Sequence, residues 1–283
     1  MGIISTEYLG RLSPVFKGKS GQKLADFFLH LTAVDKVNAL YDRSSHCSGA
    51  DFAASILEDL KVNYILGNPE RLKQLPEGAF ITISNHPYGA LDGVILIDLF
   101  GHLRADYKYM VNQFLALIKT MSEHFITVTP TGNKKKDITA ASLKGVRETL
   151  SHLKENHPVG FFPSGAVSDF SLREMRIRDR QWQESIIRLI QIARVPIVPI
   201  RFFDINSPFF YSLGLINWRI RLLRLPHEVF NKSNKDLRLG IGEIISVEEQ
   251  KQYRDCKSFR EFLRNAVYQM PLPASFAPKI LVR

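Results

Sequence analysis

Apolar positions recur at helical spacing near the start of the chain. Between residues 24 and 41 they fall three or four positions apart and leave polar residues on the opposite face, which predicts an amphipathic helix. Ser48-Gly-Ala-Asp51 has the spacing of a capping box and opens a second apolar-periodic segment that ends near Leu60. We therefore expect an N-terminal helical pair, which either packs on the core or turns one apolar face toward lipid.

After this pair, short strand patterns alternate with helical ones. The strand segments are rich in β-branched and aromatic residues and are bounded by proline or glycine. They cover residues 62–66, 79–84, 107–111, 125–128, 159–162, 196–202 and 237–245. Helical patterns occupy 138–153, 182–193 and 248–268. This alternation predicts an α/β fold, with a mostly parallel sheet flanked by helices.

The 283 residues can form one large α/β domain, because no repeat, low-complexity tract or long linker divides them. We expect a single domain made of an N-terminal helical segment (1–61), an α/β core (62–247) and a C-terminal helix with a tail (248–283). No apolar run reaches 18 residues, so we expect no spanning helix. We also expect no secretory signal. The start matches the M-G-x-x-x-[ST] pattern of N-myristoylation through Gly2 and Thr6, which matters only in a eukaryotic cell.

The charge of the chain points to an anionic partner. Its formal net charge is +10 and its sequence pI is about 9.6. Nucleic acid, an acidic lipid surface and a phosphorylated substrate all fit this excess. A basic run over 173–180 would suit nucleic acid, but no zinc-finger, homeodomain or RNP-like pattern accompanies it, so a solvated or lipid-facing surface is the better interpretation. Cys47 and Cys256 lie far apart and indicate a reducing compartment without a disulfide framework.

The most informative string is Ser84-Asn-His-Pro-Tyr-Gly-Ala-Leu-Asp-Gly93, which directly follows a predicted strand. In an open α/β sheet that position is the carboxyl edge, where ligands bind. Proline and glycine fix a tight loop around His86, and a turn could bring Asp92 back to the imidazole. A carboxylate there selects one tautomer and leaves the other ring nitrogen as a base. Such a base can take a proton from an alcohol or amine that attacks an acyl carbonyl, so no enzyme nucleophile is required.

A second loop, Pro163-Ser-Gly-Ala-Val-Ser168, follows the strand pattern at 159–162, and both loops should open on the same edge of the sheet. Ser164 fails the G-x-S-x-G pattern of a nucleophile, because Pro163 precedes it and residue 162 is Phe. We expect this loop to offer backbone N–H groups and a hydroxyl to the substrate. A metal hydrolase would need a third ligand such as His102 or His227, and neither stands at ligand spacing.

Together the two blocks resemble the glycerolphosphate acyltransferase (PlsC-like) superfamily. The closer likeness is to its bacterial haemolysin-related branch, which includes lyso-ornithine lipid O-acyltransferases. That branch has N-H-P-x-G-x-x-D-G, matched by Asn85–Gly93, and F-P-x-G-x-x-S, matched by Phe162–Ser168. The likeness runs from about Leu24 to about Ser246. Further similarity lies in Asp179 with Trp182, in Val198-Pro-Ile200 and in Phe209-Phe-Tyr211.

The resemblance implies an enzyme that moves a fatty acyl group from an acyl thioester, on acyl carrier protein or coenzyme A, to a hydroxyl of a lysolipid. No further cofactor and no metal is implied. His86 would be the general base and Asp92 its orienting partner. Acceptor lipid and an anionic membrane surface would be the partners, with the enzyme peripheral on the cytoplasmic face and without nucleic acid. The implied substrate contacts are Asn85, Gly89, Gly93, Pro163, Ser164, Gly165 and Lys134.

Two departures from the wider superfamily bear on the acceptor. Ser164 replaces the acidic residue of F-P-E-G, and 125–132 lacks the Arg that usually lies near an acceptor phosphate. Both favour a lyso-aminolipid. The alternative is 1-acylglycerol-3-phosphate acyltransferase activity, in which Lys134, Lys135 and Lys136 would bind the phosphate instead of forming a solvated basic loop. A non-enzymatic nucleic-acid binding protein is the distant alternative.

Overall fold

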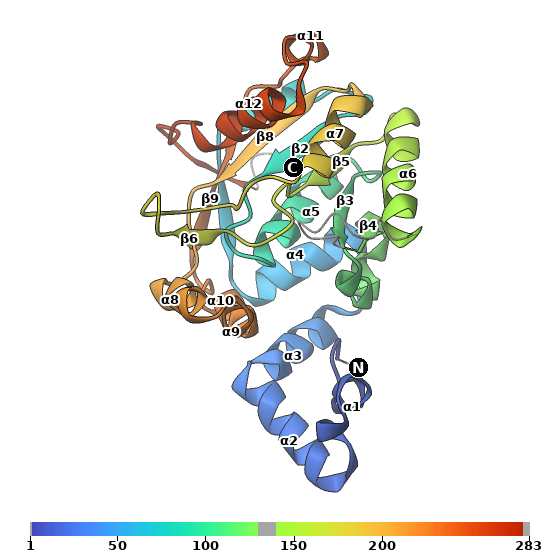
Figure 1. Cartoon of the computed structure of the whole chain (residues 1–283), viewed down its shortest axis with the longest axis vertical. Coiled ribbons are helices and arrows are strands. Elements are labelled where there is room, and N and C mark those ends of the chain that lie inside the picture. The colour runs from blue at the N-terminus through green and yellow to red at the C-terminus, as the bar shows by residue number, and fades with distance from the viewer. Residues whose placement is uncertain (1, 130–139, 280–283) are drawn as a thin grey trace.

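The computed structural model describes residues 2–129 and 140–279, and an eight-stranded sheet lies at its centre (Figure 1). The strand order is β10-β1-β9-β8-β2-β5-β3-β4. Most neighbours are parallel, whereas β8–β9 and β1–β10 are antiparallel. The strands are β1 (Asn63–Gly67), β2 (Ile81–Ser84), β3 (Lys108–Asn112), β4 (Phe125–Val128), β5 (Val159–Phe161), β8 (Ile197–Phe202), β9 (Asp236–Ile241) and β10 (Ala277–Pro278). The predicted α/β fold with a mostly parallel sheet is confirmed.

Helices cover both faces of the sheet because successive strand residues point to opposite sides. Phe80, just before β2, joins the core under α4 (Gly49–Asp59) and α5 (Leu91–Leu103). Ile81 and Ile83 join the second core, under α6, α7 and α12. These last helices span Ala140–Lys154, Glu184–Ala193 and Cys256–Tyr268. Two buried apolar layers therefore hold the central strands rigidly, and the loops at their ends inherit that rigidity.

The predicted helix over 24–41 is divided in two. Helix α2 (Gly18–Leu31) ends where the Thr32 hydroxyl donates to the carbonyl of Phe28, and Ala33 then adopts a left-handed φ of 58° before α3 (Val34–Ser44) begins. These helices and α1 (Thr6–Leu12), which the short 3₁₀ turn η1 (Pro14–Phe16) joins to α2, project from the core at the bottom of Figure 1. The left-handed residue therefore sets the angle at which α2 leaves α3.

Two further helix predictions need correction. Helix α4 begins as expected, but the capping box does not form: Ser48 makes no side-chain cap, and Asp51 instead bonds His102 Nε2 at 3.0 Å. The helix predicted over 248–268 is broken into α11 (Val247–Gln250) and α12. Asp255 causes the restart, because its carboxylate caps the first N–H groups of α12.

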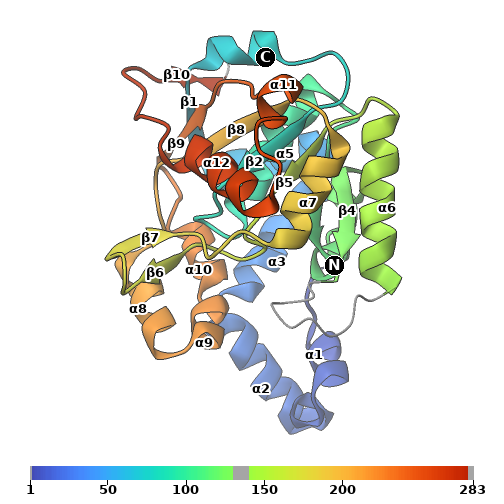
Figure 2. The ribbon, with the colours of Figure 1, turned by 45° about the horizontal axis from the view of Figure 1, so that its top comes forward.

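Two insertions were not predicted as regular structure. One is the antiparallel hairpin of β6 (Asp169–Ser171) and β7 (Arg176–Arg178). The other is a run of short helices, α8 (Pro208–Ile216), α9 (Trp218–Leu223) and α10 (Leu225–Phe230), which lies beside α2 and α3 in both views (Figures 1 and 2). Short 3₁₀ helices also occur at Pro69–Gln74 (η2), Gln113–Leu117 (η3) and Lys119–His124 (η4). Over residues 2–129 and 140–279, no helix combines the length and apolarity that crossing a membrane requires.

Candidate active site

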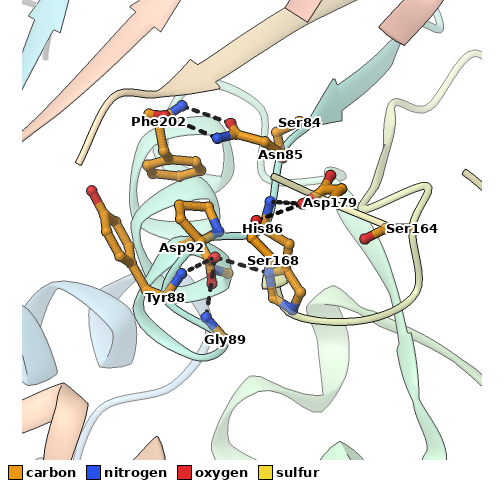
Figure 3. Close-up of polar contacts among 12 residues, drawn as sticks. Ser84, Asn85, His86, Tyr88, Gly89, Asp92, Ser164, Ser168, Asp179 and Phe202 are labelled. Atoms are coloured by element: carbon orange, nitrogen blue, oxygen red, sulfur yellow. Dashed lines mark hydrogen bonds and ion pairs between the residues drawn. The ribbon is translucent and has the colours of Figure 1, made fainter. Parts of the chain in front are cut away.

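The two loops singled out in the sequence meet at one edge of the sheet. Strands β2 and β5 are parallel neighbours, with Ile83 paired to Phe161, so the loops that follow them emerge side by side. A backbone hydrogen bond joins the loops directly, since Ser168 N donates to the His86 carbonyl at 2.8 Å. Figure 3 shows the resulting cluster around His86.

His86 and Asp92 lie in contact inside this cluster. Asp92 sits in the first turn of α5, is fully buried, and bonds His86 Nδ1 through Oδ2 at 2.9 Å. The same oxygen accepts the backbone N–H groups of Tyr88 and Gly89, at 3.0 and 3.2 Å. An ionised carboxylate only accepts, so Nδ1 donates and the neutral ring keeps Nε2 as its basic nitrogen. Three donors thus fix one oxygen, which in turn fixes the tautomer.

The ring of Phe162 stacks on one face of the His86 imidazole. The two ring centroids are 3.9 Å apart with an interplanar angle of 23°, and Phe162 in turn packs on Tyr109. The sequence placed Phe162 at the end of a predicted strand and in the F-P-x-G block, without indicating a contact with His86. A planar side chain stacked in this way restricts rotation of His86 about its side-chain bonds, and it keeps water from one face of the ring.

The electrostatic environment strengthens the base. Burial by itself lowers the pKa of His86, but the adjacent carboxylate of Asp92 outweighs it and holds that pKa above its ordinary value. Asp179 adds a smaller effect in the same direction. Nε2 is therefore a better proton acceptor than that of a free histidine.

Asp179 anchors the main chain of His86, a role that sequence reasoning missed. Its carboxylate accepts from His86 N at 3.2 Å, from the Ser168 hydroxyl at 2.6 Å and from Trp182 Nε1 at 3.1 Å. Its own N–H donates to the Tyr268 hydroxyl at 2.6 Å. Burial raises the pKa of this carboxyl. The only signal in the sequence was that Asp179 and Trp182 occur together in the resembling branch.

Two of the residues predicted to contact substrate, Asn85 and Gly89, have structural roles in the loop. Asn85 is committed to Phe202: its Nδ2 donates to the Phe202 carbonyl at 2.9 Å, and its Oδ1 accepts from Phe202 N at 2.8 Å. Gly89 has a φ of 87°, and a Cβ on it would lie 2.7 Å from Leu225 and 2.8 Å from Val167. Both residues therefore shape the loop instead of offering free polar groups.

Gly93 and the second loop differ from this pattern. A Cβ on Gly93 would meet nothing closer than Phe162, at 3.8 Å, so a methyl group would fit there in ordinary contact. The Ser164 hydroxyl donates to the Ala166 carbonyl at 2.7 Å, and Gln183 N donates to the Pro163 carbonyl at 2.8 Å.

Gly165, the next residue of that loop, has a φ of 62° and packs against the side chain of Gln183. Lys134, Lys135 and Lys136 lie outside the described residues. Within the described ranges, no group of three or more His, Cys, Asp or Glu residues could hold a metal ion.

Comparisons with known proteins found one family model, two curated relatives and a solved structure. A family model described as Acyltransferase matches residues 29–273. The lyso-glycine lipid O-acyltransferase of Phocaeicola vulgatus is 26% identical over 278 residues, covering 93% of this chain and 95% of the relative. The protein of the same description from Bacteroides thetaiotaomicron is 28% identical over 244 residues, with 83% and 85% coverage. A solved 1-acyl-sn-glycerophosphate acyltransferase, PlsC from Thermotoga maritima, aligns over 86% of this chain and 91% of its own, with 12% identity and a TM-score of 0.47.

Proposed function

The chain belongs to the acyltransferase family, and from that premise we propose that it transfers a fatty acyl group from an acyl thioester to the hydroxyl of a lysolipid. The observation that carries the proposal is the buried hydrogen bond between His86 and Asp92 at the carboxyl edge of the sheet, 2.9 Å long. It supplies an oriented base. Ser164, the serine of the adjoining loop, donates its hydroxyl to a backbone carbonyl, so it is not presented to an acyl group as a nucleophile.

The reaction proceeds by direct attack. His86 Nε2 takes the proton of the acceptor hydroxyl as that oxygen bonds to the thioester carbonyl carbon. The carbon–sulfur bond then breaks, and the leaving thiolate takes the proton from the imidazolium. Asp92 stabilises the imidazolium between the two proton transfers, because its negative charge lies against Nδ1. The products are an ester and a free thiol, so no oxidant and no covalent enzyme intermediate is involved.

For the acceptor we propose a lyso-aminolipid in preference to lysophosphatidic acid. Both curated relatives are described as acting on lyso-glycine lipid. Residues 125–132 lack the Arg that usually lies near an acceptor phosphate and can bind it bidentately, and neutral Ser164 stands at the usual acidic position. An unpaired buried phosphate would be costly, so in the alternative glycerol-phosphate reaction we expect Lys134 or its neighbours to replace that Arg.

Peripheral association with an anionic membrane surface is the second part of the proposal. Helices α2, α8 and α9 lie at the same end of the molecule (Figures 1 and 2), and each carries exposed apolar side chains. They are Leu24, Phe27, Leu31, Phe209, Leu215, Ile216, Trp218, Ile220 and Leu223. Arg219 and Arg224 lie among them in the sequence. An apolar face with interleaved cations is the composition of a surface-lying membrane segment.

Steady-state kinetics with one acyl thioester and the two acceptors in competition test the acceptor class. We expect a higher kcat/KM for the lyso-aminolipid. A preference of about tenfold for lysophosphatidic acid, which is roughly 1.4 kcal/mol, would overturn that assignment. His86→Ala should fold and lose about 10² to 10⁴ in rate. His46→Ala is the matched control, since His46 is an exposed histidine that bonds the carbonyl of Arg43.

Sedimentation with vesicles tests the membrane proposal. The protein should pellet with anionic vesicles at low salt and be released as salt rises, since juxtamembrane cations contribute roughly 1 kcal/mol each and are screened. Trp218→Ser should weaken this binding while leaving turnover of a micellar or short-chain acceptor intact. Absence of protein from the pellet at low salt would count against peripheral association.

A further inference from the structure

A pocket of about 760 Å³ lies between the β6–β7 hairpin, residues 179–182 and α12. Its notable lining is cationic, with arginines from all three segments. They are Arg173, Arg178, Arg180, Arg260 and Arg264. The sequence suggested that the basic run over 173–180 forms a solvated or lipid-facing surface. The folded chain brings this run together with two arginines from some 80 positions further along the chain.

The positive charge in this pocket is only partly compensated. Arg178 pairs with Glu174, and Arg180 pairs with Asp169 at 3.0 Å. Within the described part of the chain, no carboxylate lies at ion-pair distance from the other three arginines, although exposed Glu261 also lines the pocket. The charges of Asp179 and Glu174 act on Arg264 through space and raise its pKa, so the pocket lining sets five arginines against four carboxylates.

Two of these guanidinium groups contact the same aromatic ring. Arg178 and Arg264 both lie over the ring of Tyr268, at 4.8 and 5.0 Å from its centroid. Burial lowers the pKa of Arg264, and the like charge of Arg178 lowers it further. Guanidinium groups that are partly out of water are costly unless an anion accompanies them. The pocket therefore has the electrostatics of an anion site.

A short chain of contacts links this pocket to the base. Arg264 Nη2 donates to the Asp179 carbonyl at 2.8 Å, and the Asp179 carboxylate accepts from His86 N at 3.2 Å. One residue thus separates the arginines from the main chain of His86. An anionic group bound there would lie near the reacting centre without occupying it.

We propose that this pocket binds the phosphate of the acyl donor, the group common to the pantetheine arms of coenzyme A and acyl carrier protein. The inference rests on the proposed thioester-dependent function. Guanidinium forks match phosphate oxygens bidentately, and several arginines suit a polyanion better than a single carboxylate. In such a donor the pantetheine chain separates the thioester from the phosphate, so the phosphate must be held beside His86 and not at it.

The test compares donors with and without phosphate. Arg173→Gln and Arg260→Gln remove pocket charges that have neither a carboxylate partner nor a contact with Asp179. Each should raise KM for acyl-coenzyme A or acyl carrier protein by about tenfold, the usual cost of one hydrogen bond to a charged group. KM for acyl-pantetheine, which has no phosphate, should not change. Arg188→Gln is the matched control, because Arg188 pairs with Glu184 on the surface of α7.

Each outcome has one reading. Equal KM changes for acyl-pantetheine and its phosphorylated counterpart, or no change for either, would overturn the proposal. A rise in the KM for the lysolipid instead of the donor would assign the pocket to the acceptor and would also overturn the proposal. Which phosphorylated donor responds identifies the carrier. No transfer from any thioester would instead refute the proposed function. In that case, calorimetry of coenzyme A binding still tests the phosphate site. Loss of binding in both Arg173→Gln and Arg260→Gln would support the site, and unaffected binding would refute it.

Discussion

Replacing Asp92 by Asn isolates the charge of the His86–Asp92 pair from its geometry. Tyr88 N and Gly89 N both point at Oδ2, so the Asn side chain must place its oxygen there and its amide group at the Oδ1 position. That oxygen can still accept from His86 Nδ1, and the tautomer is preserved. The amide group then faces Gly93 N, which lies 3.2 Å from Oδ1, as the single mismatched contact.

The expected loss is therefore mainly electrostatic. Two unit charges about 4 Å apart interact by about 4 kcal/mol at an effective dielectric of about 20. Removing the carboxylate should slow acyl transfer by up to about 10³-fold, because each 1.36 kcal/mol is a factor of about ten in rate. The pKa of His86 should also fall, since burial then acts without the opposing carboxylate.

The assay is thiol release from an acyl thioester, with kcat/KM measured across pH. Asp98→Asn is the control: Asp98 is an equally buried carboxylate on α5, and it bonds Tyr64 and Lys279 instead of His86. The control should retain wild-type kcat/KM and the wild-type acid limb. If Asp92→Asn behaves like Asp98→Asn in both respects, the carboxylate does not assist the base and the reasoning fails.

Other expectations follow from the same geometry. In the wild type, activity should fall as pH drops through a pKa above the ordinary histidine value of about 6.5, and a rate independent of pH from 5 to 8 would contradict a histidine base. The ion pair of protonated His86 with Asp92 should stabilise the fold fully below about pH 6.5. This contribution should disappear as pH rises through the raised pKa of His86, and denaturation at several pH values would reveal it. Gly89→Ala should cost about 1–3 kcal/mol of unfolding free energy, because Gly89 has a left-handed backbone and its new Cβ would press on Leu225 and Val167. Gly93→Ala should leave the melting temperature unchanged and raise the KM for an acceptor that lies beside this residue. Asp179→Asn should cost about 1–3 kcal/mol in urea unfolding, because one buried donor then meets an amide N–H group; a stability equal to wild type would mean that the cluster relaxes around it.

The fold could be predicted from the sequence wherever the local pattern of apolar residues agrees with their burial. The strand at 125–128 could be predicted because its apolar and β-branched residues lie between polar segments. The helix at Glu184–Ala193 could be predicted because its apolar residues form one stripe. The break at Ala33 was not accessible, because alanine favours helix and only tertiary packing holds it at a left-handed φ. The hairpin over 169–178 was missed for a related reason, since three-residue strands carry too few positions to show a period.

The site was predictable to the extent that its residues are close in sequence. His86 and Asp92 are separated by one tight turn, so proline and glycine between them were enough to suggest contact. Asp179 acts on His86 from 93 positions away, and only the parallel pairing of β2 and β5 brings its loop into reach. Phe162 lies at the end of a strand pattern, which does not report the direction of its ring. Long-range polar contacts of this kind leave no periodic trace in the sequence.

The reciprocal bonds between Asn85 and Phe202 imply that Asn85 serves as a surrogate peptide unit. A carboxamide has the same donor and acceptor as a backbone amide, and Asn85 bonds both backbone groups of Phe202, a reciprocal pattern that the parallel strands β2 and β8 do not form with each other. Asp has no N–H to donate and Gln adds a methylene, so neither should reproduce both bonds at this distance. Asn85 therefore fastens the end of β2 to the end of β8, and this link fixes the start of the loop that carries His86.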